Sequence, residues 1–336
     1  MSQSALYCGP IEAVQRPFAA FVLAVSGGFR GYPNGNGMNS PEDQGAFLET
    51  SKPVTLTAAD GYFLAATRFE AQRNLRGHVV MAGATGVPQT FYRRFAEYLC
   101  VQGFSTLTLD YRGIGQSKRG DLKGFNASFL DWARLDLAAA VEAMRSEDVP
   151  LFVVGHSFGG HAFGLLPNHH HVSRCYTFGT AAGWHGWMPF KESLRVRLMW
   201  NTVLPILVFW KGYAPMSLIG VGEDLPLGVY RQWRRWCKFP HYFLDDPQMP
   251  DIVAQYARVR IPIAAANAFD DLWALPRSRD AFMGGYSNAC IKTVDLDPRD
   301  YGGKIGHMGY FRKTAQPLWN DVVLWFESEL AGGRCE

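Results

Sequence analysis

The chain has 336 residues, of which 48% are hydrophobic and 19% are charged, and its net charge is +3. This length is enough to bury a full core, and the composition is that of a globular protein rather than a disordered one. The small net charge and the lack of a basic stripe argue against nucleic-acid binding. The 6 cysteines are scattered without a C-x-x-C pair. This spacing argues against a disulfide framework and a zinc site, and favours reduced thiols in the cytoplasm.

Residues 1–50 are expected to form an N-terminal extension of unknown role. Their apolar run at 18–25 is too short to span a bilayer. It is also a poor signal sequence, because Glu12 precedes it and basic residues are sparse. We therefore expect a cytoplasmic protein with no stable membrane insertion.

From Val54 onward, runs typical of strands alternate with amphipathic helical stretches. Strands are predicted at 54–57, 63–67, 78–82, 105–109, 151–154, 175–178, 261–266 and 290–294, and helices at 91–102, 129–145 and 317–330. Asp60-Gly61, between the first two runs, predicts a hairpin. The later alternation of strands and helices predicts right-handed βαβ units and a mainly parallel sheet.

Residues 184–258 break this alternation, because they contain no strand-like pattern and hold many of the chain's tryptophans. Two helices are predicted within them, at 191–204 and 227–237. The run lies between two strands of the sheet, so we expect a helical cap at 184–258 on a core formed by 51–183 and 259–336. Its apolar segment from 199 to 210 would suit an interfacial role, but buried packing is the favoured interpretation. Pro205 is predicted to break or kink a helix there.

The most informative motif is G-x-S-x-G at 155–159, with Ser157 at its centre. It follows an apolar strand and opens into a helix, and such a turn lifts the serine hydroxyl above the sheet. A serine nucleophile needs a base, and the base needs an orienting acid. Asp270 and Asp271 follow the next-to-last strand, and His307 follows the last one. The order of these residues predicts a catalytic triad of Ser157, His307 and one of the two aspartates.

These motifs resemble the α/β-hydrolase superfamily. The resemblance is carried by residues 155–159, by the run DYRGIGQS at 110–117 and by GHMG at 306–309, and it covers about 54–330. It implies an α/β-hydrolase fold with a mainly parallel eight-stranded sheet flanked by helices and a helical cap inserted after the sixth strand. The cap is similar to that of a poorly characterised bacterial branch grouped loosely with serine aminopeptidase-like hydrolases.

The resemblance also assigns roles to individual residues. Counted from Pro262, the family's acid falls at Asp271, which is therefore favoured over Asp270. The residues expected to bind the oxyanion are Phe158, through its N–H, and one residue of the Gly83–Thr85 turn, with Ala84 favoured. The residues expected to contact substrate are Thr85, His156, Trp184 and Trp187. His156 is also expected to pack beneath the serine turn.

The resulting hypothesis is a serine hydrolase that cleaves a small, fairly apolar ester through an acyl-enzyme on Ser157. An acyltransferase with the same triad is the nearest alternative. An aminopeptidase, using Glu223 and Asp224 for a free amino terminus, and a non-catalytic ligand receptor are less favoured. No cofactor or metal is expected, because His169-His170-His171 cannot all point to one side. The predicted partner is a small ester, with a homodimer left open.

Overall fold

The computed structural model describes residues 51–332, and the predicted N-terminal extension lies outside them. Strands and helices alternate along most of this range. The strands are β1 (Ser51–Thr57), β2 (Phe63–Phe69), β3 (Gly77–Ala82), β4 (Phe104–Leu109), β5 (Leu151–His156), β6 (Val172–Phe178), β7 (Ile263–Ala268) and β8 (Ile291–Leu296). The helices are α2 (Arg93–Val101), α3 (Phe129–Asp131), α4 (Ala138–Met144), α5 (Phe158–Phe163), α6 (Phe190–Leu198), α7 (Leu204–Lys211), α8 (Leu227–Trp236), α9 (Ile252–Tyr256), α10 (Pro276–Met283), α11 (Gly306–Gly309) and α12 (Gln316–Leu330).

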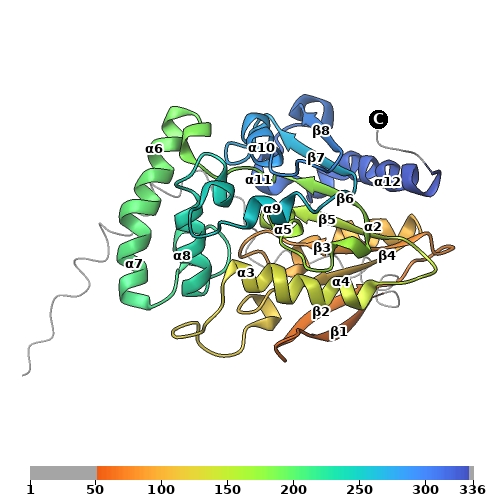
Figure 1. Cartoon of the computed structure of the whole chain (residues 1–336), viewed down its shortest axis with the longest axis horizontal. Coiled ribbons are helices and arrows are strands. Elements are labelled where there is room, and N and C mark those ends of the chain that lie inside the picture. Colours follow the sequence, from red (N-terminus) through yellow and green to blue (C-terminus); the bar gives the residue numbers. More distant parts are fainter. Residues whose placement is uncertain (1–50, 333–336) are drawn as a thin grey trace, which may run out of the picture.

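The strands within residues 51–332 form one sheet in the order β1-β2-β4-β3-β5-β6-β7-β8 (Figure 1). β2 pairs antiparallel with both neighbours, and every pairing from β4 to β8 is parallel. The hairpin between β1 and β2 turns at Gly61, whose φ of 82° favours glycine. The predicted eight-stranded, mainly parallel sheet is thus confirmed.

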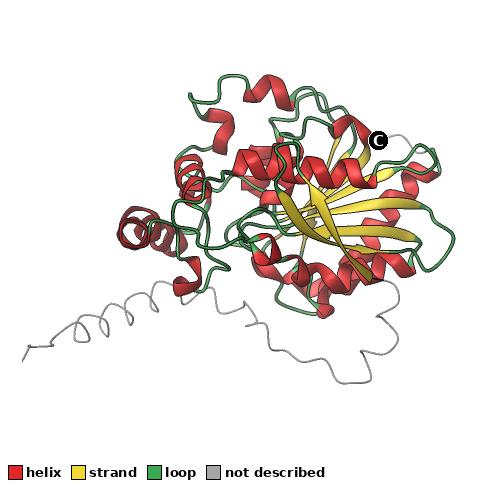
Figure 2. Cartoon of the chain, turned by 90° about the horizontal axis from the view of Figure 1, so that it is seen from below, coloured by secondary structure: helices red, strands yellow, loops and turns green. Residues whose placement is uncertain are grey.

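Helices cover both faces of the sheet, as Figure 2 shows. Val79 and Met81 of β3 pack into one apolar cluster with α2 and α12. Val80 and Ala82, between them in sequence, pack into the other cluster with α4 and α5. Successive side chains of a strand point to opposite faces, so a strand buried on both faces reads as one continuous apolar run.

Between β6 and β7 the chain forms helices α6 to α9, which lie largely to one side of the sheet (Figure 1). α6 runs through a π-helical turn, Met199–Val203, directly into α7. Of the two predicted effects of Pro205, a break or a kink, the break is therefore wrong. Pro205 stands just after the π-helical turn, where the regular hydrogen-bond ladder is already interrupted and the missing proline N–H is tolerated.

The outer face of this continuous helix is exposed and rich in large apolar side chains. Phe190 is 82% exposed, Phe209 86% and Trp210 73%. For Phe209 and Trp210, which belong to the segment 199–210, the expectation of buried packing is wrong. The inner face agrees with that expectation, since Val203 and Leu204 are buried. A sequence segment that is apolar all round does not itself say which side faces the core.

Contacts from α8 and the loop before it fix this helical segment to the sheet domain. Trp236 stacks on Phe129 with ring centroids 5.6 Å apart. The side-chain oxygen of Gln232 accepts a hydrogen bond from the Phe129 N–H at 2.8 Å. Glu223 Oε2 accepts the Gly115 N–H at 2.7 Å. These bonds engage backbone N–H groups near the start of α3 and in the loop after β4.

The cysteines differ from one another. Cys100, Cys175 and Cys237 are buried and free. Cys290 is disulfide-bonded, so the expectation of reduced thiols is wrong at that position. None of the helices in residues 51–332 combines the length and the apolar character needed to cross a membrane.

Candidate active site

The serine turn joins β5 to α5 and holds Ser157 in a strained conformation. Its φ is 51° and its ψ is −111°, which L-residues rarely adopt. The Ser157 N–H donates to the Phe178 carbonyl at 2.9 Å. A Cβ at Gly159 would lie 1.9 Å from the Ala82 carbonyl oxygen, and one at Gly155 would lie 2.5 Å from the Gly160 nitrogen. The two glycines of the motif are required because backbone occupies the space of a side chain.

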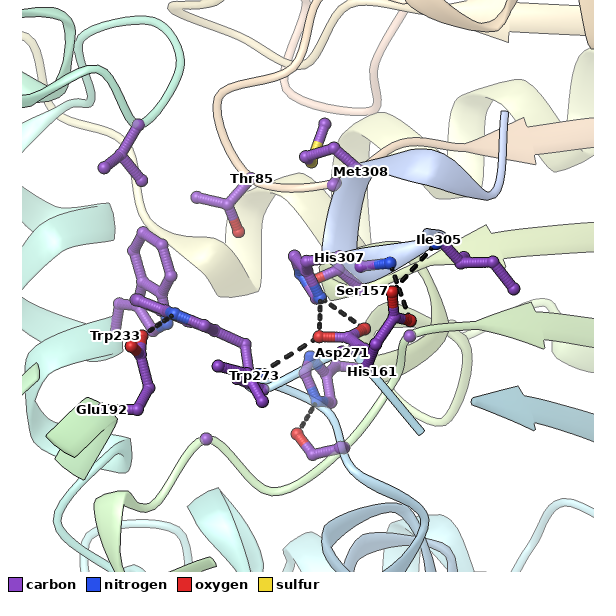
Figure 3. Close-up of a pocket in the computed structure, with 18 of the residues that line it drawn as sticks. Thr85, Ser157, His161, Glu192, Trp233, Asp271, Trp273, Ile305, His307 and Met308 are labelled. Carbon is purple, nitrogen blue, oxygen red and sulfur yellow. Dashed lines mark hydrogen bonds and ion pairs between the residues drawn. The ribbon is translucent and has the colours of Figure 1, made fainter. Parts of the chain in front are cut away.

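Ser157, His307 and Asp271 form a continuous hydrogen-bonded chain (Figure 3). Ser157 Oγ lies 3.0 Å from His307 Nε2. His307 Nδ1 lies 2.9 Å from Asp271 Oδ2 and 3.1 Å from Oδ1. The three residues come from the turn after β5, the loop after β7 and α11, which the parallel sheet brings to one edge.

The Asp271 carboxylate is fully buried and accepts several further hydrogen bonds. The Tyr310 hydroxyl donates to Oδ2 at 2.9 Å. The N–H groups of Trp273 and Ala274 donate to Oδ1, each at 3.1 Å. Burial raises the pKa of Tyr310 well above its usual range, so the hydroxyl stays protonated as a donor. These donors compensate for the burial of the charge and fix the carboxylate against His307.

The neighbouring Asp270 has a different position. Its carboxylate accepts the N–H groups of Ile305 and Gly306, at 3.0 and 2.9 Å. It therefore holds the loop that carries His307 rather than the imidazole itself. Of the two aspartates left in competition by the sequence, the structure brings Asp271 to the histidine.

The second predicted oxyanion donor requires a correction. The Ala84 N–H donates to Tyr92 Oη at 2.7 Å, so the prediction that this group is open to substrate is wrong. Thr85 lines the cavity beside Ser157, and its N–H has no acceptor among the described residues. The Phe158 N–H likewise has no acceptor there. Both lie where the serine turn meets the loop after β3.

His156 lies beneath the serine turn and is completely buried, so its assignment to substrate binding is wrong. Its Nδ1 lies 2.9 Å from Tyr92 Oη, and its Nε2 lies 2.9 Å from the His307 carbonyl oxygen. Burial, followed by repulsion from His307, lowers the pKa of His156 to about 3. Because the Tyr92 hydroxyl also accepts the Ala84 N–H, this chain of bonds links the loop after β3 to the His307 loop.

A cavity of about 370 Å³ opens over Ser157. Trp233 of α8, Trp273 of the Asp271 loop, Thr85 and Met308 line it (Figure 3). Thr85 thus lies where the sequence placed it. The predicted Trp184 and Trp187 are not among the lining side chains.

The two displaced tryptophans pack elsewhere. The rings of Trp184 and Trp187 pack edge to face, with their centroids 5.8 Å apart. The Trp187 indole N–H donates to the Pro240 carbonyl at 2.7 Å. Trp233 and Trp273 line the cavity in their place. The position of Trp273 could have been predicted from the sequence, because it stands two residues after Asp271 in a loop expected to end beside Ser157.

One charged pair from the helical segment also reaches the cavity. Glu192 and Arg195 of α6 form an ion pair with each other, and Glu192 Oε1 accepts the Trp273 indole N–H at 2.9 Å. The carboxylate is 11% exposed at its side chain. Its charge is therefore balanced within the wall. Glu223 and Asp224, considered for an amino terminus, bond the Gly115 N–H and Ser217 instead.

His161, four residues after the serine on α5, forms part of the cavity wall. Its Nε2 lies 2.8 Å from the Ala181 carbonyl, and its ring stacks on Tyr242 at 4.7 Å. Burial lowers its pKa to about 4. No three metal-binding side chains gather anywhere in residues 51–332.

Comparisons with known proteins agree with this architecture. A family model described as serine aminopeptidase, S33, matches residues 73–204. No curated protein sequence matches the chain significantly.

Solved structures match a larger part of the chain. A soluble variant of monoglyceride lipase from Saccharomyces cerevisiae aligns with a TM-score of 0.57 at 17% identity, over 83% of this chain and 96% of that one. An esterase from Exiguobacterium antarcticum aligns with a TM-score of 0.55 at 14% identity, over 82% of this chain and 100% of that one. The esterase domain of a Rhodothermus marinus protein aligns with a TM-score of 0.51 at 16% identity, over 82% of this chain and 97% of that one. The resemblance drawn from the motifs is thus confirmed, and the chain has the fold of the α/β-hydrolase superfamily.

Proposed function

We propose that this protein is a serine hydrolase that cleaves a small, fairly apolar carboxylic ester. The observation that carries the proposal is the continuous chain from Ser157 Oγ through His307 to the buried Asp271, at 3.0 and 2.9 Å. A nucleophile, a base and an orienting acid at these distances are the requirement of acyl transfer to serine.

In the proposed reaction, Ser157 Oγ attacks the ester carbonyl while His307 Nε2 takes its proton. The imidazolium then protonates the departing alcohol oxygen, leaving an acyl-enzyme. Water attacks that acyl group, with His307 again as base, and releases the acid and Ser157. Asp271 holds the proton on His307 Nδ1 throughout and stabilises the imidazolium.

The negative charge that develops on the carbonyl oxygen needs donors fixed in advance. We propose the N–H groups of Phe158 and Thr85, because both lie at the reacting centre without another acceptor among the described residues. Removing one such donor typically costs 10²- to 10³-fold in rate, i.e. roughly 3–4 kcal/mol. The Tyr92–Ala84 bond would then hold the Thr85 loop in position.

The substrate class follows from the cavity. Trp233, Trp273 and Leu272 supply apolar surface, and Glu192 and Arg195 in the wall balance each other. Lys304 and Arg312 also line the cavity and form no ion pair within residues 51–332. A cavity of about 370 Å³ is at the small end for ligand sites. We propose that residues 184–258 act as a cap that supplies this wall.

Labelling with a fluorophosphonate probe tests the activated serine. Wild-type protein should be labelled, Ser157→Ala and His307→Ala should not, and the control Ser287→Ala, an exposed serine, should behave like wild type. A folded wild-type protein that resists the probe, or a Ser157→Ala variant that is still labelled, would contradict the proposal. Initial rates with p-nitrophenyl esters of increasing chain length would then define the acyl group.

An aminopeptidase is the second candidate, favoured by the description of the family model that matches residues 73–204. A free amino terminus needs an unbalanced carboxylate, and Glu192 is already paired with Arg195. Amino acid p-nitroanilides separate the two candidates. Turnover of these amides faster than the matching p-nitrophenyl esters would favour the peptidase.

A further inference from the structure

A second, smaller cavity of about 120 Å³ lies on the helical segment, away from Ser157. Its lining residues come from α6, the π-helical turn Met199–Val203, α8 and the two residues after it, and from His185. Three of its lining residues are cations, namely Arg197, Arg234 and Lys238, and none of its lining residues is acidic.

The cations of this cavity differ from their neighbours along the same helices. Arg195, two residues before Arg197, is paired with Glu192. Arg235, next to Arg234, is paired with Asp246 at 2.5 Å. Within the described residues, the carboxylates of this region thus pair with cations outside the cavity. Arg197, Arg234 and Lys238 form no ion pair there. No carboxylate of residues 51–332 therefore compensates these three charges, of which Arg197 and Lys238 are exposed and Arg234 is half-buried.

Two residues that line the cavity, Arg234 and Trp200, carry hydrogen-bond donors and are held in place by packing and hydrogen bonds. Arg234 Nε donates to the Trp200 carbonyl at 2.8 Å, which holds the guanidinium against the π-helical turn. Trp200 lines the cavity, is 5% exposed, and its indole N–H has no partner among the described residues. A buried donor left without an acceptor costs free energy, typically about 1–3 kcal/mol. An acceptor supplied by a ligand would remove that cost.

A nearby histidine reports the same positive environment. His185 lines the cavity, and its Nδ1 bonds the Ser193 hydroxyl at 3.2 Å. Burial and then the charge of Arg197 lower the pKa of His185. The smaller of these two causes, the charge of Arg197, is the one that agrees with a site for a negative ligand.

We propose that this cavity, between Arg197, Arg234 and Lys238, binds a phosphate group. Three cations and an indole donor match a dianion with several acceptor oxygens, and guanidinium groups fit phosphate oxygens in pairs. The volume corresponds to about four water molecules at ~30 Å³ each, which suits a phosphate group rather than a whole drug-sized ligand. The site is independent of the proposed hydrolase activity.

Two sources can supply such a group, a soluble phosphate compound or the headgroup of an anionic lipid. The exposed face of the continuous helix formed by α6 and α7 gives a reason to test the lipid source. Phe209 and Trp210 stand out from α7 beside Lys211, which is also exposed. Aromatic side chains with flanking cations are typical of helices that lie on an anionic membrane surface.

The first arm of the test is calorimetric titration of the full chain with inorganic phosphate, with chloride at equal ionic strength as the blank. Arg197→Gln and Lys238→Gln should each weaken binding at least about tenfold, as expected for a lost charge-assisted hydrogen bond. Lys191→Gln in both arms, and Lys211→Gln in this arm only, are matched controls, because both cations are exposed on the same continuous helix and lie outside the cavity. They should change affinity less than about twofold. Trp200→Phe tests the indole donor with little change of shape.

The second arm is co-sedimentation with phosphatidylcholine vesicles containing phosphatidic acid. Saturable binding in either arm that is lost in Arg197→Gln and Lys238→Gln, and kept in the controls, supports the site. Binding only to inorganic phosphate identifies a soluble source, and binding to the vesicles identifies a lipid headgroup. No saturable binding in either arm overturns the proposal. Binding that the cavity variants and the controls weaken equally also overturns it.

Discussion

Two buried polar groups of this protein differ in how completely they are hydrogen-bonded. One is the carboxylate of Asp271, and the other is the indole N–H of Trp200, beside the cationic cavity on the helical segment. Asp271 is fully buried, and it receives donors from His307, Tyr310 and two backbone N–H groups. The Trp200 indole N–H, nearly as buried, has no acceptor within the described chain. Complete hydrogen bonding fixes a single geometry, whereas open donors leave capacity for a ligand. The Asp271 carboxylate is thus fully hydrogen-bonded within the described chain, and the Trp200 indole N–H is not.

The largest expected effect tests how tightly the reacting centre is determined. Asp271→Asn should lower kcat for a p-nitrophenyl ester by roughly 10⁴-fold, because an amide no longer fixes the His307 tautomer. Asp270→Asn is the matched control and should lose no more than about tenfold, since the amide oxygen can keep one of the two backbone hydrogen bonds and the bond between His307 and Asp271 is untouched. A larger loss in Asp270→Asn than in Asp271→Asn would reverse the assignment of the acid.

The second comparison uses two glycines. Gly159→Ala brings a Cβ within 1.9 Å of the Ala82 carbonyl oxygen, so the serine turn or β3 must move. The free energy of unfolding should fall by about 3 kcal/mol or more. Gly220, in the helical segment, has a φ of +71° and open space around it. Gly220→Ala should cost about 1 kcal/mol, from backbone strain alone. Urea unfolding measures the free energy of unfolding of both variants. Equal losses in Gly159→Ala and Gly220→Ala would contradict the expectation that only the first meets a backbone clash.

Acid should lower the stability of the protein through two buried histidines, His156 and His161. The folded-state pKa values of His156 and His161 are about 3 and about 4, below the ordinary value of 6.5. Between about pH 6.5 and these values the unfolded chain binds more protons than the folded one. Their contribution to stability is therefore complete above pH 6.5 and is lost as pH falls. Each histidine contributes a slope of up to ~1.4 kcal/mol per pH unit.

Urea unfolding at pH 7 and pH 5 checks this slope in wild type and in His161→Phe. The variant keeps a ring against Tyr242, loses the Ala181 hydrogen bond at both pH values, and should show the shallower pH dependence. An unchanged slope would mean that His161 is not held neutral by burial.

The smallest expected effect lies on the outer helix face. Phe209→Ser and Trp210→Gln replace side chains that are 86% and 73% exposed. Unfolding free energy should change by less than about 0.5 kcal/mol. Losses above about 1 kcal/mol in urea unfolding would show that the face is covered in solution and that the helical segment is as closed as the reacting centre.

The strands, the serine turn and the chain order of Ser157, Asp271 and His307 could all be predicted from the sequence, because each depends on a short local pattern. β5, the turn and α5 are contiguous, and Gly155 and Gly159 mark the close backbone contacts that the turn requires. A parallel sheet then brings the ends of β5, β7 and β8 to one edge, whatever the details of the loops. The count from Pro262 favoured Asp271, but only the bonds of Asp270 to the His307 loop separated the two.

Only the tertiary structure decided where the side chains of the loops and the helical segment point. The Tyr92 hydroxyl accepts the N–H of Ala84, whereas the N–H of Thr85 has no acceptor among the described residues. Nothing in the sequence from 82 to 86 predicts which of these two N–H groups is bonded. Trp233 and Trp273 reach the cavity, and Phe209 faces outward from an evenly apolar helix. Periodicity fixes side-chain direction within a repeating element, but a loop or an all-apolar helix has no such reference. Its orientation is set by partners distant in sequence, which local pattern does not encode.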